Sequence, residues 1–512
     1  MTTFASQDAH DGNINSGSCS VEIHSALNVS DPPLAPYDER LAIIFRYRKQ
    51  LNVNLGSWFV EENWMNPSVV SCASGKKASE LDVSTGWGNP ESAKAVSEKH
   101  WDTWTTEDDF ALPQRIGINT VRIPIGYWSL GVSYCQDTPF EDVANVYEQS
   151  WPRALRAISW ASRYSIGVLI DLHGAPGQAH AGTSDGNIGL FENEDNIKKT
   201  IEVLTYLTHR LVPVSNVVGI QILNEPQNVA SLPHFLIDTL RKVSPGAARF
   251  PFYTHDGFDL EWFSGYVGQR KDFVVQDHHS YFVFAPEDSS KPVVDHISNV
   301  NSSIMLSFFA ASKRAPLTPD SFSKLPEGTT QQAACKTFCG AQSPVYLHTT
   351  AGWSVYEDGW CFRKAVGLSL PSKFSIWDDS RDASQVRHCA RENQGSQDNL
   401  RSMVAHDEPL DTDDYEAVPR NVHSEARSLA RPITGTPPSI NPTPALTFAE
   451  FEASRLVFTT QYMEDTLATL LSSGSIHPEN GGSYRKGFMK GLAKGECKVK
   501  QAIATGAAIP DA

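Results

Sequence analysis

The sequence predicts an α/β fold, specifically a (β/α)8 TIM barrel, and three observations lead to this prediction. Apolar segments bounded by polar turns alternate with segments whose apolar residues recur every three or four positions, as in strands alternating with amphipathic helices. Most strand candidates are apolar along their length, which indicates parallel strands covered on both faces. No G-x-G-x-x-G motif follows the first strand candidate, so a closed barrel is favoured over an open doubly wound sheet.

The strand candidates follow one another from residue 52 onward. The first four are NVNLGSW at 52–58, INTVRIPIGYW at 118–128, IGVLIDLHG at 166–174 and VVGIQILNEP at 217–226. Three more are RFPFYTH at 249–255, DFVVQDHHSYFVF at 272–284 and SPVYLHTTAGW at 343–353. Helical periodicity lies between them, most clearly at 151–164 and 196–211, so the order is strand, helix, strand, helix.

The segment where a seventh strand is due shows no apolar strand pattern. Residues 302–322 read SSIMLSFFAASKRAPLTPDSF, in which 303–312 predicts a helix that runs directly into Leu317–Ser321. A barrel that lacks one strand has unpaired backbone groups at two edges. We therefore expect the barrel to be incomplete at its seventh strand, or another segment to substitute, for which SIMLSFFAA is the apolar candidate.

Composition divides the chain into four regions. Residues 1–45 are a polar lead-in, and 46–378 hold the predicted barrel. Residues 379–446 are rich in charge, Ser and Pro, which predicts a disordered insertion. Residues 447–512 regain helical periodicity and are expected to form C-terminal helices that pack on the barrel.

Charge and hydropathy exclude several classes of partner. A formal charge of −16 and a pI near 5.5 argue against a nucleic acid partner and against an anionic membrane surface. No run of about 18 apolar residues occurs, so we expect no membrane span. The N-terminus lacks a basic segment followed by an apolar core, which makes the cytosol the simplest location, and we expect a monomer.

Polar residues gather at the carboxyl ends of the strand candidates. Those ends meet at the face where α/β barrels form their ligand sites. The polar and aromatic residues concerned are Trp58, Arg122, Tyr127, Asp171, His173, Asn224, Glu225, His278, His279 and Tyr281. The run Asp277, His278, His279 could suggest a metal site, but consecutive strand side chains point to opposite faces, so no metal site and no cofactor are predicted.

Six motifs carry a family resemblance. VNLGSWFVEENWM, HWDTWTTEDDF, GINTVRIPIGYW, GVLIDLHGAPGQ, GIQILNEP and VVQDHHSYFVF occur in this order. Together they resemble glycoside hydrolase family 5, and within it the fungal exo-β-1,3-glucanase-like branch. The resemblance covers residues 43–373 and returns at 446–500, so it includes both the predicted barrel and the C-terminal helices.

The resemblance implies a retaining hydrolase of β-glucosides that uses one Glu as acid/base and another as nucleophile. Position by position, Glu225 matches the acid/base, and a general acid at neutral pH needs a carboxyl with a raised pKa. Asn224 matches the residue that holds the sugar 2-hydroxyl, and Arg122 the arginine beside the nucleophile. The full set of substrate-binding residues implied by the resemblance is Arg122, His173, Asn224, His279, Tyr281 and Trp353.

The nucleophile that the resemblance implies at the end of the seventh strand is not found. Of the nearby acids, Glu287, Asp320 and Glu327, none is predicted to end a strand. Either a coding segment is absent here and again after residue 354, or the chain has diverged into a non-catalytic form.

The resemblance predicts hydrolysis of β-1,3-glucan or a related β-glucoside, in polysaccharide catabolism or cell-wall glucan remodelling. A non-catalytic glycan-binding protein and a glucosidase of lipid-linked glucose are the alternatives. The resemblance also implies an extracellular or cell-wall location as the alternative to the cytosol.

Overall fold

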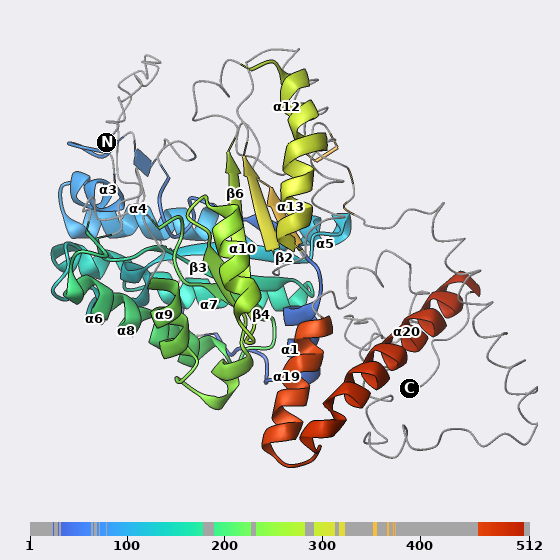
Figure 1. Ribbon diagram of the computed structural model, residues 1–512. Coiled ribbons are helices and arrows are strands. Elements are labelled where there is room, and N and C mark those ends of the chain that lie inside the picture. The colour runs from blue at the N-terminus through green and yellow to red at the C-terminus, as the bar shows by residue number, and fades with distance from the viewer. Residues whose placement is uncertain are drawn as a thin grey trace, which may run out of the picture.

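Eight parallel strands form a closed barrel in the computed structural model of the chain (Figure 1). Apart from short gaps between residues 63 and 78, the structure describes residues 32–177, 189–226, 232–281, 291–312, 317–322, 352–355 and 459–505, with a few single residues outside these ranges. The strands are β1 Gln50–Asn54, β2 Thr120–Gly126, β3 Gly167–Gly174, β4 Val217–Gln221, β5 Phe252–His255, β6 Val274–Tyr281, β7 Leu317–Phe322 and β8 Gly352–Val355.

Each strand pairs with the next along the chain, and β8 pairs with β1 to close the barrel. β2, β3, β4 and β5 are buried along their whole length, as their apolar sequences predict. The prediction of a (β/α)8 barrel is therefore confirmed. The proposed disordered insertion at 379–446 and most of the lead-in at 1–45 lie outside the described residues.

The sequence-based reading of the seventh strand was wrong about where that strand lies. Residues 303–312 are helical as predicted, but Leu317–Phe322 form β7, which pairs with β6 over six residues. The segment LTPDSF is short, polar and contains Pro319, so it carries no apolar strand pattern. Its strand conformation follows from the unpaired edge of β6, which supplies a complete row of backbone partners.

Helices follow the strands around the barrel and bury an apolar face against them. In α7, Ala154, Leu155, Ile158 and Ala161 recur at helical spacing and are fully buried. The helices are α1 Glu39–Tyr47, α3 Glu80–Gly86, α4 Pro90–Thr103, α5 Ala111–Ile116, α6 Val132–Cys135, α7 Ser150–Arg163, α8 Glu194–Leu211, α9 Leu232–Leu240, α10 Leu260–Gln269, α12 Val293–Asn299, α13 Met305–Ser312, α19 Thr459–Ser472 and α20 Gly481–Thr505. None of the helices in the described part of the chain combines the length and apolar character needed to cross a membrane.

A second apolar cluster joins the two ends of the described chain. Tyr47 of α1 packs edge-on against Tyr462 of α19, and its hydroxyl donates to Asp465 at 2.8 Å. Phe488 of α20 belongs to the same cluster, which also reaches strands β3 to β6. Figure 1 shows α19 next to α1, where these contacts anchor the C-terminal helices to the barrel.

Candidate active site

Arg122 is the centre of a hydrogen-bonded network at the carboxyl end of the barrel strands. Its Nε donates to Oε1 of Gln221 and its Nη1 to Oδ1 of Asn54, both at 2.8 Å. Its Nη2 donates to Oδ1 of Asn224 and lies 2.8 Å from Oδ2 of Asp171. Only 1% of Arg122 is exposed, so these acceptors and one counter-charge replace water around the guanidinium and hold its plane fixed.

Glu225 is buried just after β4, in an unusual backbone conformation. Its φ is 38°, in the left-handed region that non-glycine residues rarely adopt. Its Oε1 accepts hydrogen bonds from Nδ1 of His279 and from the hydroxyl of Tyr281. Strained backbone that surrounding contacts hold in place is typical of functional sites.

His279 links Glu225 to a second carboxylate. Its Nε2 lies 3.1 Å from Oδ2 of Asp277, which also accepts from Nε2 of Gln221 at 2.7 Å. Because both ring nitrogens face carboxylates, Asp277 and Glu225 raise the pKa of His279 well above 6.5 although burial opposes them. Burial likewise opposes the shift at Asp277, whose pKa His279 lowers, so we assign an imidazolium to His279.

His173 joins the same system through Asp171. Its Nδ1 lies 2.7 Å from the Asp171 Oδ2 that also contacts Arg122. These contacts form one connected set of side chains from strands β1 to β4 and β6, which we call the rim network. The rim network comprises Asn54, Arg122, Asp171, His173, Gln221, Asn224, Glu225, Asp277, His279 and Tyr281.

Glu62 is a buried carboxyl beside the rim network that sequence reasoning missed. The backbone N–H of Ser57 donates to its Oε1 at 3.3 Å. Burial raises the pKa of Glu62, and the nearby negative charge of Glu225 acts in the same direction. His173 and Arg122 oppose this shift, so Glu62 faces the same charges as the rim network.

Glu225, His255 and His279 lie close enough to hold a metal ion, with one ligand atom of each within 4.8 Å of the others. The hydrogen bonding of His255 argues against such a site. Its Nδ1 accepts from the backbone N–H of Gly257 at 3.0 Å, so the neutral ring carries its proton on Nε2 and offers no lone pair there.

His278 also differs from His279 in its partner, since its Nδ1 lies 2.7 Å from Asp256 Oδ2.

The structure brings together six of the predicted site residues in one network. Arg122 bonds Asn224 and reaches His173 through Asp171, and Glu225 bonds His279 and Tyr281. Gln221 and Asp277 connect these two sets. The backbone of Trp353 pairs with Leu51 in β8, and its side chain lies outside the described part of the structure.

Asp320 is the one nearby acid that the structure places in a strand. Its backbone is the register partner of His279 on one side and of Ser354 on the other. Asp320 therefore lies inside β7, two residues before its end, in a segment for which the sequence predicted no strand. Glu287 and Glu327 lie outside the described residues.

Asn54, Gln221 and Glu62 all lie inside the quoted motifs VNLGSWFVEENWM and GIQILNEP. Gln221 and Asn54 are the last residues of their strands, a position that could have identified them. His255 ends β5 in the same way. Glu62 follows β1 by eight residues, so neither periodicity nor spacing predicts that it returns to the site.

Comparisons with known proteins agree with this geometry. The model of the family "Cellulase (glycosyl hydrolase family 5)" matches residues 73–244, which run from before α3 to the segment after α9. Residues 73–244 are thus similar to glycosyl hydrolase family 5. The fold and the position of the rim network at the carboxyl ends of the strands are as expected for a family 5 barrel.

Two fungal relatives show the likeness in sequence. The chain is 36% identical over 256 residues to "Glucan 1,3-beta-glucosidase 3" of Schizosaccharomyces pombe, covering 48% of this chain and 54% of that protein. It is 32% identical over 282 residues to "Glucan 1,3-beta-glucosidase" of Blumeria graminis, covering 52% of this chain and 64% of that protein. The matches thus span less than two thirds of either relative.

A solved structure shows the same fold. The rutinosidase from Aspergillus niger superposes with a TM-score of 0.50 at 18% sequence identity, covering 64% of this chain and 99% of that one. At this identity the likeness concerns the fold alone.

Proposed function

We propose that this chain hydrolyses β-1,3-glucan or a related β-glucoside, with Glu225 as the acid/base. The observation that carries the proposal is the placement of Glu225, which is buried and held by two donors where β4 opens onto the rim. The likeness to the family and the glucan 1,3-β-glucosidase relatives support the reaction class.

The geometry suits proton transfer to a glycosidic oxygen. The His279 and Tyr281 donors converge on one oxygen of Glu225, so the direction of the carboxyl is set before substrate binds. Arg122 holds the oxygen of the Asn224 amide, so the amide nitrogen is the atom that a sugar hydroxyl would meet. The rim network thereby positions both the acid and the sugar.

A retaining mechanism also needs a second carboxylate about 5 to 5.5 Å from the first. Among the described residues, Glu62 and Asp320 are the candidates that the structure supports best. Glu62 is buried among the charges of Arg122, His173 and Glu225. Asp320 has the register position next to His279 on β7, the strand on which the family resemblance implies the nucleophile.

Azide rescue of alanine variants distinguishes the roles of these acids. Where the nucleophile is lost, azide attacks the sugar directly and gives an α-glucosyl azide from a β-glucoside. Where the acid/base is lost, azide replaces water in the second step and gives a β-glucosyl azide. We expect the β product from Glu225→Ala, and the α product from either Glu62→Ala or Asp320→Ala.

Hydrolysis of laminarin and of an aryl β-glucoside tests the proposal. We expect Glu225→Gln to lower kcat/KM for laminarin roughly 1000-fold, because it removes the transferable proton. Glu202→Gln, on the exposed side of α8, is the matched control and should leave kcat/KM unchanged. Equal activity of the two variants would exclude Glu225 as the acid/base.

One observation favours a second candidate, a glycan-binding protein without turnover. The only acid in β7 is Asp320, whose side chain is one methylene shorter than the Glu that the resemblance implies. Measurable binding of laminarin with no release of reducing sugar would favour this candidate.

The location and oligomeric state are proposals as well. We propose a monomer. Cys72 and Cys497 each take part in a disulfide, and disulfides persist mainly in oxidising compartments. This supports the extracellular or cell-wall location over the cytosol, and fractionation of the source cells into wall, medium and cytosol tests it.

A further inference from the structure

The motif HWDTWTTEDDF, at residues 100–110, supplies no side chain to the rim network, but it holds the turn that follows β1. Nε2 of His100 donates to the carbonyl oxygen of Ser57 at 2.6 Å. Nε1 of Trp104 donates to the carbonyl oxygen of Gly56 at 3.0 Å. Both donors lie at the carboxyl end of α4, so this helix fixes two successive peptide units of the turn.

The turn has a backbone conformation that needs such support. The φ of Ser57 is 52°, in the left-handed region that non-glycine residues rarely adopt, and the residue is fully buried. The next residue binds in the opposite direction, since Nε1 of Trp58 donates to the carbonyl oxygen of Trp101 at 2.9 Å. We call the three hydrogen bonds between residues 56–58 and the end of α4 the turn clamp.

The turn clamp sets the position of Glu62. The N–H of Ser57 donates to Oε1 of Glu62 at 3.3 Å, and the N–H of Glu62 donates to Oγ of Ser57 at 3.1 Å. These two reciprocal bonds tie the Glu62 carboxyl to the same residue whose carbonyl oxygen His100 holds. A displacement of Ser57 would therefore move Glu62 as well.

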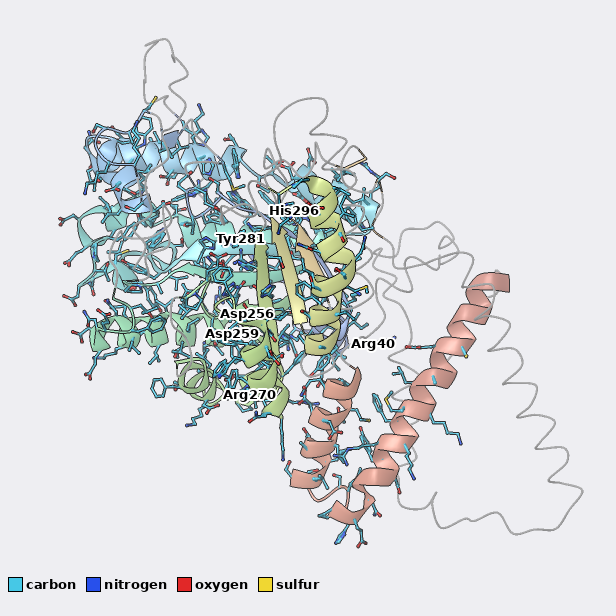
Figure 2. The ribbon with its side chains drawn as sticks, turned by 45° about the horizontal axis from the view of Figure 1, so that its top comes forward. Arg40, Asp256, Asp259, Arg270, Tyr281 and His296 are labelled. Atoms are coloured by element: carbon cyan, nitrogen blue, oxygen red, sulfur yellow. The ribbon has the colours of Figure 1, made fainter. Side chains whose placement is uncertain are left out.

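Gly56 leaves the space that brings Glu62 against the rim network. A Cβ atom on Gly56 would lie 3.0 Å from Oε1 of Glu62 and 3.0 Å from Nδ2 of Asn54, which is tighter than ordinary van der Waals contact. The glycine thus lets the Glu62 carboxyl and the rim residue Asn54 approach the same Cα. Because all strands are parallel, this turn opens on the face that Tyr281 marks at the end of β6 in Figure 2, away from Arg270.

We propose that His100 and Trp104 are positioning residues for Glu62, which they hold at the rim through the turn clamp. The proposal rests on the proposed function, in which Glu62 is a candidate for the second carboxylate. A carboxyl that takes part in such chemistry must be held within about 0.5 Å of its working position. Loosening the turn should therefore lower turnover, although neither donor belongs to the rim network.

The experiment compares two substitutions of His100 by hydrolysis of 2,4-dinitrophenyl β-glucoside. His100→Gln keeps a side-chain N–H that can donate to the Ser57 carbonyl oxygen, whereas His100→Leu removes the donor. We expect His100→Leu to lower kcat/KM about 30-fold, and His100→Gln to stay within about threefold of the unsubstituted chain.

Trp104→Phe tests the second donor of the turn clamp. Trp104 is 38% exposed, so its replacement by another aromatic residue should cost little stability. We expect kcat/KM to fall about fivefold, because the Gly56 carbonyl oxygen loses its donor.

Phe110→Leu is the matched control for both donors. Phe110 is buried in the same motif but packs against the rings of Trp160 and Tyr164. Its substitution should lower the free energy of unfolding in urea while leaving kcat/KM within about twofold of the unsubstituted chain.

A double-mutant cycle shows whether the effect runs through Glu62. In the Glu62→Ala background, with azide present, His100→Leu should change the residual kcat/KM less than about twofold, because the carboxyl that it positions is absent. If His100→Leu does not fold, Trp104→Phe takes its place in the cycle.

An equal loss in both backgrounds, or a His100→Gln variant as impaired as His100→Leu, overturns the inference and leaves the proposed function standing. Failure of the unsubstituted chain to hydrolyse any β-glucoside overturns both.

Discussion

Two groups of buried acids differ in how the cost of burying a negative charge is avoided. In one group the acids are paired with cations, and in the other they keep their protons. In the rim network, Asp171 and Asp277 are matched by Arg122 and by a protonated His279. The second group, which we call the carboxyl pair, consists of Glu61 and Glu80. The backbone N–H of Glu61 donates to Oε2 of Glu80 at 2.5 Å, and no positive charge raises or lowers the pKa of either.

His100 is the nearest basic side chain to the carboxyl pair, at 3.3 Å from Oε1 of Glu61. Burial lowers the pKa of His100 to about 4, so at neutral pH it is a neutral donor, and its Nε2 contacts the carbonyl oxygen of Ser57 at 2.6 Å. We therefore treat the contact with Glu61 as a contact between neutral groups. Burial and the neighbouring Glu80 raise the pKa of Glu61 well above 4.5.

In these two groups, an acid is ionised where a cation lies beside it and keeps its proton where none does. Ser57 lies between the carboxyl pair and Glu62, the acid beside the rim network, because its hydroxyl contacts Glu61 and its N–H donates to Glu62. The charges of Asp277 and His279 should thus stay constant across neutral pH, while the carboxyl pair gains charge as the pH rises.

Breaking the compensation of the rim network should have the largest effect on stability. Arg122→Met leaves Asp171 buried without its cation, and we expect the free energy of unfolding to fall by about 4 kcal/mol in urea denaturation. Arg163→Met is the control, because Arg163 pairs with Glu107 on the surface and should cost less than about 1 kcal/mol.

The double variant Arg122→Met, Asp171→Leu sharpens this test. Removing both charges together should restore part of the loss, since the cost of the single variant comes from an uncompensated charge. A single variant as stable as Arg163→Met would show that the rim is not held by charge compensation.

Removing the charge of the carboxyl pair should have an effect that depends on pH. Burial raises the pKa of Glu80 from 4.5 to about 7. The protonated Glu80 side chain therefore contributes fully to the free energy of unfolding below pH 4.5, and this contribution is lost as the pH rises through about 7. Glu80→Gln cannot ionise. We therefore expect its stability relative to the unsubstituted chain to improve by about 3 kcal/mol between about pH 4.5 and pH 8.

Urea denaturation at several pH values measures this change. A Glu80→Gln difference that stays flat with pH would mean that the carboxyl pair is already ionised at low pH.

The two groups also differ in how far the sequence predicts them. The strands β1 to β6 and the gathering of Arg122, Asn224, Glu225, His279 and Tyr281 follow from apolar runs that end in polar residues. β7 could not be predicted in this way, because its six residues owe their conformation to the edge of β6 rather than to their own pattern.

The carboxyl pair was beyond prediction for a different reason. Glu80 lies on α3, 19 residues after Glu61, so no local pattern links the two. Buried carboxyls without a cation are rare, so the sequence predicts that both side chains are exposed.

Tyr147→Phe is the smallest and most specific change to the carboxyl pair. The Tyr147 hydroxyl donates to Oε1 of Glu80 at 2.8 Å and also contacts the hydroxyl of Ser84. Its loss should cost about 1 kcal/mol, the value of one neutral hydrogen bond. The same bond lowers the pKa of Glu80 in the folded chain, so without it Glu80 should keep its proton to a higher pH and the loss of stability with rising pH should continue to a higher pH. Phe110→Leu is the control, because it changes a buried aromatic residue but removes no hydroxyl. It should lower the free energy of unfolding without moving the pH at which the loss of stability ends. If Tyr147→Phe shows the same pH dependence as Phe110→Leu, the hydroxyl does not act on Glu80.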